Sequence, residues 1–270
     1  MSTVEKYVPK DGDPVLPLFS LKGKTAIVTG AGAGIGYAVA DAFAEAGANV
    51  AFLYNSNTKA IERAAETAAK YGVKCQAYGV EVTSQEEVEA VVDQVVKDFN
   101  NRLDVFVANA GIPWIKGPIL DAKDHAHYHN VIATDLDGVY FSAYAAGKYF
   151  KQQGSGSFIA TASMSGHIVN IPQMQATYNA AKAGVIHFCK SLAVEWAGFA
   201  RVNTVSPGYI ATEISGFVPA ETKKIWHSKT PMGREGLANE LKGAYLYFAS
   251  DASTYTTGSD LICDGGYCAP

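Results

Sequence analysis

Three side chains in the second half of the chain could move a proton to or from a carbonyl oxygen. Tyr178 and Lys182 are four residues apart, and Ser163 comes fifteen residues before Tyr178. If residues 174–197 form a helix, the phenol and the ammonium lie on one face, one turn apart. A free tyrosine has a pKa of about 10, and a fixed ammonium nearby lowers it. Carbonyl–alcohol interconversion needs a proton donor or acceptor that works near pH 7. The same spacing also occurs in solvated surface pairs, so the surrounding elements must show whether this pair belongs to a catalytic site.

Those elements follow one repeated pattern from Lys24 onward, in which short apolar segments alternate with amphipathic ones. We expect strands at residues 25–29, 49–54, 73–80, 104–110, 157–163, 201–206 and 261–264. A helix that carries Ile35, Val39 and Phe43 on one face is expected after the first strand. Further helices are expected over 58–71, behind a capping box at 84–87, and over 125–152, 174–197 and 238–250, with a long loop or lid at 209–232. This alternation predicts the α/β class, a single Rossmann-type doubly wound parallel sheet of about seven strands with helices on both faces. Residues 1–20, which hold three prolines, are expected to form an arm before one domain over 21–270.

Composition excludes several classes of partner. The 270 residues are 48% apolar with a formal net charge of −4, which suits one large α/β domain and provides no attraction to nucleic acid or anionic membrane. No apolar stretch approaches the ~20 residues of a membrane helix, and no secretory signal is expected at the N-terminus. Cys75, Cys189, Cys263 and Cys268 lack metal-ligand or redox spacing. We therefore expect reduced thiols and a cytoplasmic location.

A glycine-rich turn separates the first expected strand from the first helix. It carries Gly30, Gly32, Gly34 and Gly36, with Ile35 between the last two. Glycines there permit positive φ and let the backbone approach a pyrophosphate, which a helix N-terminus then stabilises. A tight turn without a ligand is the alternative, but its place on the first strand–helix connection favours a dinucleotide.

The end of the second expected strand indicates which dinucleotide. NAD sites usually offer an Asp or Glu there, whereas this chain has Asn55, Ser56 and Asn57, with Lys59 close behind. A carboxylate would repel a 2′-phosphate, and amide, hydroxyl and ammonium groups suit one. Ser56 or Thr58 could instead only cap the following helix, and no arginine is present at the strand end. We predict NADP(H) as the cofactor.

A histidine cluster raises the question of a metal. In His125, His127 and His129, neighbours two apart point to different helix faces, so at most the outer two could pair. No Cys or Glu completes a ligand set by sequence, and we predict no metal site.

Taken together, these motifs resemble the short-chain dehydrogenase/reductase family over nearly the whole chain from about residue 20. They occur in the family's order: the glycine-rich turn, Asn109-Ala110-Gly111, Ser163, Tyr178-x-x-x-Lys182, Pro207-Gly208 and Asp264-Gly265-Gly266. Further segments are similar to its fungal branch of NADP-dependent mannitol 2-dehydrogenases and L-sorbose or L-xylulose reductases, with related yeast carbonyl reductases.

The resemblance implies a role for each matching residue. Tyr178 would be the general acid in reduction and the base in oxidation, Lys182 would hold the nicotinamide ribose, and Ser163 would hydrogen-bond the substrate oxygen, with Ser165 as the alternative serine. The implied coenzyme contacts, besides the residues above, are Glu81, Val82, Asn109, Ala110, Gly111, Pro207, Gly208, Ile210 and Thr212. Glu81 departs from the more usual Asp.

One departure concerns the proton relay. Many members carry a catalytic Asn on the helix after strand four, and this chain has Asp135 in its place. A carboxylate cannot donate a hydrogen bond as an amide does unless it is protonated. Asp135 could hold a water that links Lys182 to solvent, or it could only orient the helix.

Substrate contacts should come from loops at the carboxyl ends of the strands. The candidates are Trp114, Ser165, His167, Asn170, Tyr209, Phe217 and Trp226. The tryptophans could instead pack a lid, and His167 could make only a structural hydrogen bond. The resemblance implies an NADPH-dependent ketose–polyol reductase and a homotetramer. The alternatives are a reductase of hydrophobic ketones with the same mechanism and a dinucleotide sensor without turnover.

Overall fold

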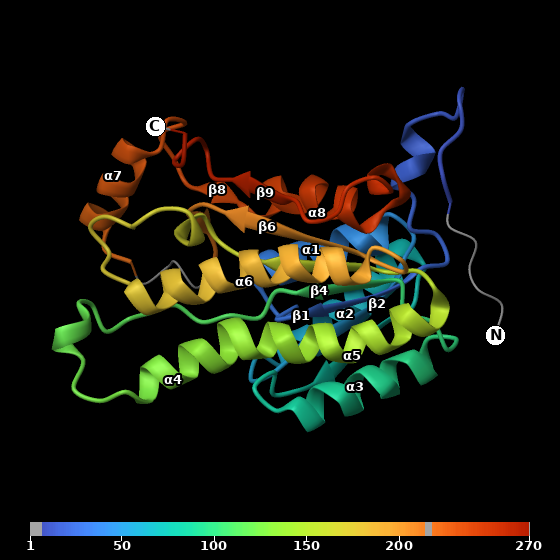
Figure 1. Ribbon diagram of the computed structural model, residues 1–270, viewed down its shortest axis with the longest axis horizontal. Helices are drawn as coiled ribbons and strands as arrows, with labels where there is room; N and C mark the ends of the chain where they lie inside the picture. Colours follow the sequence, from blue (N-terminus) through green and yellow to red (C-terminus); the bar gives the residue numbers. More distant parts are fainter. Residues whose placement is uncertain (1–6, 214–217, 270) are drawn as a thin grey trace.

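The computed structural model describes residues 7–213 and 218–269, and their framework is one parallel sheet (Figure 1). Its strand order is β3-β2-β1-β4-β5-β6-β9, and every neighbouring pair is parallel. The strands are β1 (Thr25–Thr29), β2 (Asn49–Tyr54), β3 (Cys75–Gly79), β4 (Val105–Ala108), β5 (Ser157–Thr161), β6 (Arg201–Pro207) and β9 (Asp260–Cys263). The predicted sheet of about seven parallel strands is confirmed.

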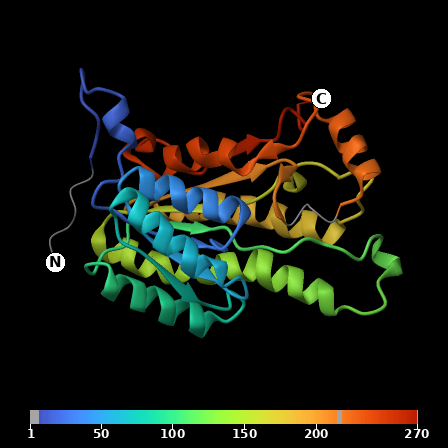
Figure 2. The ribbon, with the colours of Figure 1, turned by 180° about the vertical axis from the view of Figure 1, so that it is seen from behind.

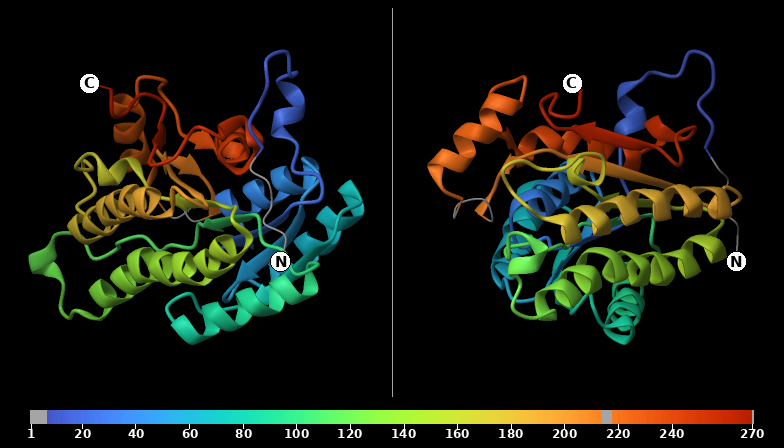
Figure 3. Two further views of the ribbon diagram at one scale, coloured as in Figure 1. Left: turned by 45° about the vertical axis from the view of Figure 1, so that its right-hand side comes forward. Right: turned by 60° about the vertical axis from the view of Figure 1, so that its left-hand side comes forward.

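Helices cover both faces of the sheet, as a sheet with two buried faces requires. One face packs against α1 (Gly34–Glu45), α2 (Lys59–Tyr71) and α8 (Lys242–Ala249), which lie in front in Figure 2. The other packs against α3 (Gln85–Asp98), α5 (Gly138–Gln153) and α6 (Ala176–Trp196). Figure 3 shows α5 and α6 lying side by side on that face.

The chain reverses its direction of travel across the sheet at β1, which pairs with β2 on one side and β4 on the other. The loops after β1 and β4 therefore separate above the sheet. In open α/β sheets this switch point is where a dinucleotide binds. Figure 1 shows α7 (Ala220–Lys229), the C-terminus and the segment before α4 (Ala126–Ile132) beyond one end of the sheet, and the N-terminal segment at the other end.

The helix expected over 125–152 is interrupted by a π-helical turn. After α4 the chain forms η3 (Ala133–Asp137) and then continues as α5. Such a turn adds one residue to the local repeat and often marks a functional position. Here it contains Asp135, whose side chain is fully buried.

The predicted loop at 209–232 is partly wrong, because it contains regular structure. Ile210–Ala211 form β7, which pairs in parallel with β8 (Gly236–Leu237), and α7 follows Pro219. Two-residue strands give no alternating pattern, and α7 buries only Trp226 among its described residues, so neither has a strong signal in the sequence.

The expected capping box is half formed. Ser84 accepts a hydrogen bond from the backbone N–H of Glu87, but the Glu87 carboxylate accepts from the N–H of Glu81 rather than from that of Ser84. The remaining helical turns are η1 (Leu16–Phe19), η2 (Ile119–Asp121), η4 (Met164–Gly166), η6 (Ala238–Leu241) and η7 (Asp251–Ser253). Within residues 7–213 and 218–269, no helix is both long and apolar enough to cross a membrane.

Candidate active site

Tyr178 and Lys182 lie on the same face of α6, as their spacing predicts. The Lys182 ammonium is 5.5 Å from the centroid of the Tyr178 ring, and the lysine side chain is 3% exposed. A buried ammonium must have partners, because an unpaired charge away from water is costly. Lys182 donates to the carbonyl oxygen of Thr161 at 3.1 Å, and its Nζ lies 2.9 Å from Oδ1 of Asp135.

The π-helical turn brings Asp135 to this position. Its second carboxylate oxygen accepts from the backbone N–H of Ile112 at 3.0 Å. Burial favours the neutral form of Lys182, but the charges of Asp135 and Tyr178 outweigh it, and the pKa of Lys182 is raised. The structure therefore favours a charged lysine held between strand β5 and the turn.

The Tyr178 phenol is subject to opposing effects. Burial raises its pKa, the Lys182 ammonium lowers it, the Asp135 carboxylate raises it and a hydrogen bond from Ser163 lowers it. The net direction is upward. The expected effect of Lys182 is thus present, but burial together with Asp135 outweighs it, so the phenol in this state is a proton donor at neutral pH.

The structure favours Ser163 over Ser165 as the serine beside the tyrosine. Ser163 hydrogen-bonds Tyr178, and its Oγ accepts from the backbone N–H of Ser165 at 3.1 Å. The Ser165 hydroxyl instead accepts from Nε2 of Gln175 at 3.1 Å. Ser163 is placed at the end of β5 by the short helical turn η4, whose N-cap it forms.

The glycine-rich turn has the backbone that its sequence predicts. Gly30 and Gly34 have φ of 66° and 54°, a region that other residues adopt at a cost. A Cβ on Gly36 would collide with the carbonyl oxygen of Gly30 and come within 2.6 Å of the Asn109 amide. The turn therefore leads directly into the N-terminus of α1 with no side chain in the way, which fits a pyrophosphate.

Asn109 holds the ends of three strands together. Its Nδ2 donates to the Thr29 carbonyl at 3.0 Å, and its Oδ1 accepts from Thr161 at 3.1 Å. The N–H groups of Asn109 and Ala110 both donate to the Thr29 hydroxyl. Asn109 thus shapes the crevice at the switch point, and its predicted contact with a coenzyme stays a prediction.

Gly111 approaches the buried ion pair closely. A Cβ at this position would lie 2.6 Å from Asp135 Oδ1 and 3.3 Å from Lys182 Nζ. Only glycine leaves room for the carboxylate and the ammonium to meet beneath this backbone segment.

At the end of β2 the predicted polar side chains are held by other parts of the protein. Asn55 donates to the Glu81 carboxylate at 2.7 Å. Asn57 donates to the Gly32 carbonyl at 3.2 Å and accepts from the N–H of Lys59, so Asn57 rather than Thr58 caps α2 with its side chain. Ser56 is exposed, and Val82 borders a narrow crevice with Thr29 and Ala110.

Arg63 was missed by the sequence reasoning, which considered only the strand end. It lies one turn into α2, and its guanidinium donates to the Gly32 carbonyl within the glycine-rich turn. Helical spacing from the N-terminus of α2 could have indicated that this residue faces the turn.

The segment after β6 also reaches the turn. The Thr212 methyl group lies 3.3 Å from where a Gly34 Cβ would be, which places Thr212 beside Gly34. Gly208 donates to the Cys263 carbonyl at 3.0 Å, and a Cβ there would lie 2.6 Å from Asp264 Cα, so β6 and β9 approach closely after Pro207. Ile210 begins β7.

Three of the candidate substrate residues belong to one hydrogen-bonded network. Gln175 Nε2 lies within 3.0–3.2 Å of oxygens of Ser165, Asn170 and Asn179, and Asn170 donates to the Tyr209 hydroxyl at 3.1 Å. Gln175, which the sequence reasoning missed, stands three residues before Tyr178. The network joins Ser163, through Ser165, to the aromatic residues of α7 and the C-terminal segment.

The other candidates take part in packing or structural bonds. Trp114 is buried, and its indole donates to the Gly117 carbonyl at 2.7 Å. His167 pairs with Asp260 at 2.7 Å. Trp226 stacks on Tyr209 with ring centroids 3.9 Å apart. Phe217 lies outside the described residues. The packing and structural alternatives thus have direct support, and substrate contact by these residues stays a prediction.

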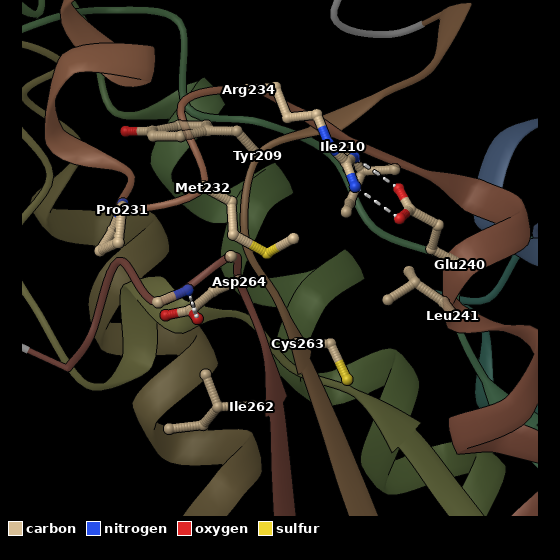
Figure 4. Close-up of a pocket in the computed structure, with 13 residues that line it drawn as sticks. Tyr209, Ile210, Pro231, Met232, Arg234, Glu240, Leu241, Ile262, Cys263 and Asp264 are labelled. Atoms are coloured by element: carbon tan, nitrogen blue, oxygen red, sulfur yellow. Dashed lines mark hydrogen bonds and ion pairs between the residues drawn. The ribbon is translucent and has the colours of Figure 1, made fainter.

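A cavity of about 540 Å³ lies at the carboxyl ends of β6 and β9 (Figure 4). Tyr209, Ile210 and Asp264 line it, but Ser163, Tyr178 and Lys182 do not. Figure 4 shows Arg234 and Glu240 joined by two hydrogen bonds at one side of the cavity, at 2.7 and 2.8 Å. Hydrogen bonds from Arg234 and from the backbone N–H of Leu237 lower the pKa of Glu240 to about 2, so the two side chains form a charged ion pair in the cavity wall. The cavity shares Tyr209 with the hydrogen-bonded network of Asn170 and Gln175 but contains none of the three proton-transfer residues.

The three histidines have structural neighbours. His125 precedes α4 as its N-cap residue, the His127 ring contacts the Pro113 carbonyl at 3.1 Å, and His129 packs edge-on against Tyr128. Across the part of the chain that the structure describes, no group of three or more His, Cys, Asp or Glu residues could hold a metal ion, and the cysteines are free thiols.

A glycine-rich turn at the switch point of a doubly wound sheet, together with a tyrosine–lysine pair and a serine, defines a short-chain dehydrogenase/reductase, and the chain belongs to that family. A family model described as enoyl-(acyl carrier protein) reductase matches residues 30–268. The chain is 62% identical to an L-xylulose reductase of Hypocrea jecorina, covering 95% of this chain and 94% of that protein. It is 57% identical to a probable NADP-dependent mannitol dehydrogenase of Yarrowia lipolytica, over 97% and 94%. The crystal structure of an NADPH-dependent 3-quinuclidinone reductase of Rhodotorula rubra superposes with a TM-score of 0.92 at 47% identity, over 98% and 99%.

Proposed function

We propose that this protein is an NADPH-dependent reductase that interconverts a ketose and its polyol. NADPH, when bound, supplies the hydride that reduces the carbonyl carbon. The protein binds and polarises the carbonyl and provides the proton. Two relatives of 62% and 57% identity, named for a xylulose reductase and a mannitol dehydrogenase activity, support this substrate class.

Two hydroxyl groups act on the carbonyl oxygen. Ser163 hydrogen-bonds Tyr178 beside the end of β5, and in the proposed reaction both hydroxyls donate to the carbonyl oxygen of the substrate. As hydride reaches the carbon, negative charge grows on the oxygen, and Tyr178 transfers its proton there. The raised pKa of the phenol keeps that proton available at neutral pH. Lys182 stabilises the phenolate that remains.

The residues after β1 and β4 are suited to the coenzyme. The glycine-rich turn provides backbone without side-chain obstruction, and the Asn109-Ala110-Gly111 segment forms the opposite wall. The end of β2 carries no carboxylate of its own, and Glu81, the nearest one, is hydrogen-bonded to Asn55. These features support NADP(H) over NAD(H).

The observation that carries the choice of substrate is the polar network behind Ser163. Ser165, Asn170 and Gln175 are buried, and their hydrogen bonds are made to one another. Polyhydroxy substrates need such groups, because each buried hydroxyl without a partner costs free energy. A substrate that exchanges these internal hydrogen bonds for its own would meet amides and hydroxyls, which suit a sugar better than a purely apolar ketone.

A second candidate is a reductase of cyclic or aromatic ketones. The stacked rings of Tyr209 and Trp226 would suit an apolar substrate, and the Rhodotorula rubra protein is named for a cyclic ketone. Initial rates with xylulose, fructose, sorbose, 3-quinuclidinone and an aryl ketone separate the two. We expect the largest kcat/KM with a ketose, and no turnover of any ketose would refute the proposal. Binding of NADPH without oxidation by any carbonyl would indicate a sensor.

We further propose a homotetramer in the cytoplasm. Tyr140 and Tyr144 on α5 and Val194 on α6 are exposed, as are Leu261 and Ile262 on the edge strand β9. Exposed apolar side chains on two helices and on a sheet edge are typical of subunit contacts. Light scattering of the purified protein tests the assembly, and fractionation of cells tests the location.

A further inference from the structure

Arg63 places a positive charge directly on the glycine-rich turn. One guanidinium nitrogen, Nη1, donates to the Gly32 carbonyl, and the group lies 4.5 Å from the centroid of the Tyr37 ring. The side chain is 22% exposed. A planar guanidinium held by this hydrogen bond and by one aromatic ring is ordered before a ligand arrives, which lowers the entropy cost of binding.

The charge lies on the side of the turn that faces β2. Asn57, from the loop after β2, donates to the same Gly32 carbonyl at 3.2 Å. The N-terminus of α1, where a pyrophosphate is stabilised, begins two residues later at Gly34. In dinucleotide-binding folds the adenosine ribose is recognised at the end of the second strand. Arg63 is therefore on the ribose side of the pyrophosphate position.

The neighbouring amides are less available to a phosphate. Asn55 is hydrogen-bonded to Glu81, and Asn57 both accepts from Lys59 and donates to Gly32. A guanidinium retains further N–H groups after one hydrogen bond and matches the geometry of phosphate oxygens. Arg63 is thus better placed than these amides to bind a phosphate.

In this structure the other edge of the guanidinium contacts a carboxylate. Nη2 of Arg63 lies 3.3 Å from Oε1 of Glu213, whose side chain is 58% exposed. Ion pairs this exposed are weak and are screened by salt. A phosphate ester carries more charge and can form two parallel hydrogen bonds, so it can replace the glutamate.

We propose that Arg63 binds the 2′-phosphate of NADPH and exchanges its contact with Glu213 for that phosphate, so that the two residues together set the preference for NADPH over NADH. The inference rests on the proposed use of NADPH but not on the identity of the sugar. NADH has no 2′-phosphate and leaves the Arg63–Glu213 pair intact. Glu213 therefore acts as a competitor whose removal strengthens NADPH binding only.

The test measures dissociation constants for NADPH and NADH by titration calorimetry, without substrate. Arg63→Gln is expected to raise the NADPH dissociation constant about tenfold or more and to change that of NADH less than about twofold. Arg63→Lys keeps the charge but not the planar geometry, so its NADPH dissociation constant should lie between those of the wild type and Arg63→Gln. Glu213→Gln should lower the NADPH constant and leave the NADH constant unchanged. In the Arg63→Gln background, Glu213→Gln should have no effect.

Lys70→Gln is the matched control, because Lys70 is on the same helix and is exposed beside Asp41. It should change neither constant. Thermal melting of each unliganded variant verifies folding, and Glu213→Gln, at an exposed position, tests the proposal even if Arg63→Gln does not fold. If Arg63→Gln weakened the binding of NADPH and of NADH equally, the proposal would be overturned in favour of a pyrophosphate contact or a role in shaping the turn. An unchanged NADPH constant would also overturn it. A wild-type protein that binds both coenzymes equally would refute the coenzyme choice itself.

Discussion

The Asp135 carboxylate lies 2.9 Å from the Lys182 ammonium, and both side chains are almost completely removed from solvent. A neutral amide at position 135 could hydrogen-bond Lys182 but could not balance its charge. The carboxylate therefore reduces the influence of the lysine on Tyr178, and its own charge raises the pKa of the phenol. Burial of the phenol is the largest effect that raises its pKa, and the Asp135 carboxylate adds to it, so the tyrosine favours its protonated form although an ammonium is close by.

Asp135→Asn should consequently change the pH dependence of the reaction. Oxidation of the polyol needs the phenolate, so its rate rises with pH as Tyr178 ionises. Loss of the carboxylate lowers the pKa of the phenol, and the rising limb of kcat/KM for oxidation should move to lower pH. Asp137→Asn is the control, because Asp137 is exposed in the same turn. Coincident pH profiles for the Asp135 variant and wild type would show that the carboxylate does not set the tyrosine pKa.

Tyr178→Phe removes the proton donor and leaves the ring. We expect kcat to fall at least ~10²-fold while NADPH binding changes little, because the phenol acts on the carbonyl oxygen. Single-turnover rates and coenzyme titrations measure the two effects. Tyr255→Phe, which alters a fully exposed tyrosine, provides the comparison, and its kcat should be close to that of the wild type. A Tyr178 variant that retains a near-normal rate would refute the assigned role.

The sequence predicted the framework better than the details of the site. The strands at 25–29 and 49–54 have the predicted bounds, because continuous apolar segments between turns specify buried strands. The turn glycines and the Tyr178–Lys182 pair were predicted because each set lies within one short segment. The spacing of the residues along that segment is sufficient to place them relative to one another. Asp135 was predicted as a departure, but not its ion pair, which depends on a π-helical turn that no pattern marks.

Residues whose roles depend on distant partners were missed or only partly understood. Arg63 meets Gly32, thirty-one positions away in the sequence, and Gln175 meets Ser165 and Asn170 through a loop. His167 was considered for the substrate and has Asp260 as its partner, on a strand ninety-three positions later. The contacts of Gln175 and His167 follow from how the loops fold over the sheet, and local sequence does not encode them. The position of Arg63 on its helix, in contrast, could have indicated that it faces the turn.

Gln175→Leu tests whether the polar network recognises substrate hydroxyls. Leucine of similar size cannot donate to Ser165 or Asn170, so their oxygens lose a partner. We expect KM for a ketose to rise about tenfold or more and KM for an aryl ketone to change little. Gln173→Leu, two residues earlier and only partly buried, is the control. Equal losses for both substrates would indicate a structural role for Gln175.

Gly111→Ala tests the close approach of the backbone to the ion pair. The added methyl group would lie 2.6 Å from Asp135 Oδ1, so the carboxylate or the backbone must move. Overpacking of this kind costs about 1–3 kcal/mol, and the free energy of unfolding should fall by that amount in urea titrations. A displaced Asp135 would also release Lys182, so kcat should decrease. Gly198→Ala is the matched control, because a Cβ there meets no atom within 4 Å. If Gly111→Ala matched Gly198→Ala in both stability and kcat, the tight packing of this segment around the ion pair would be disproved.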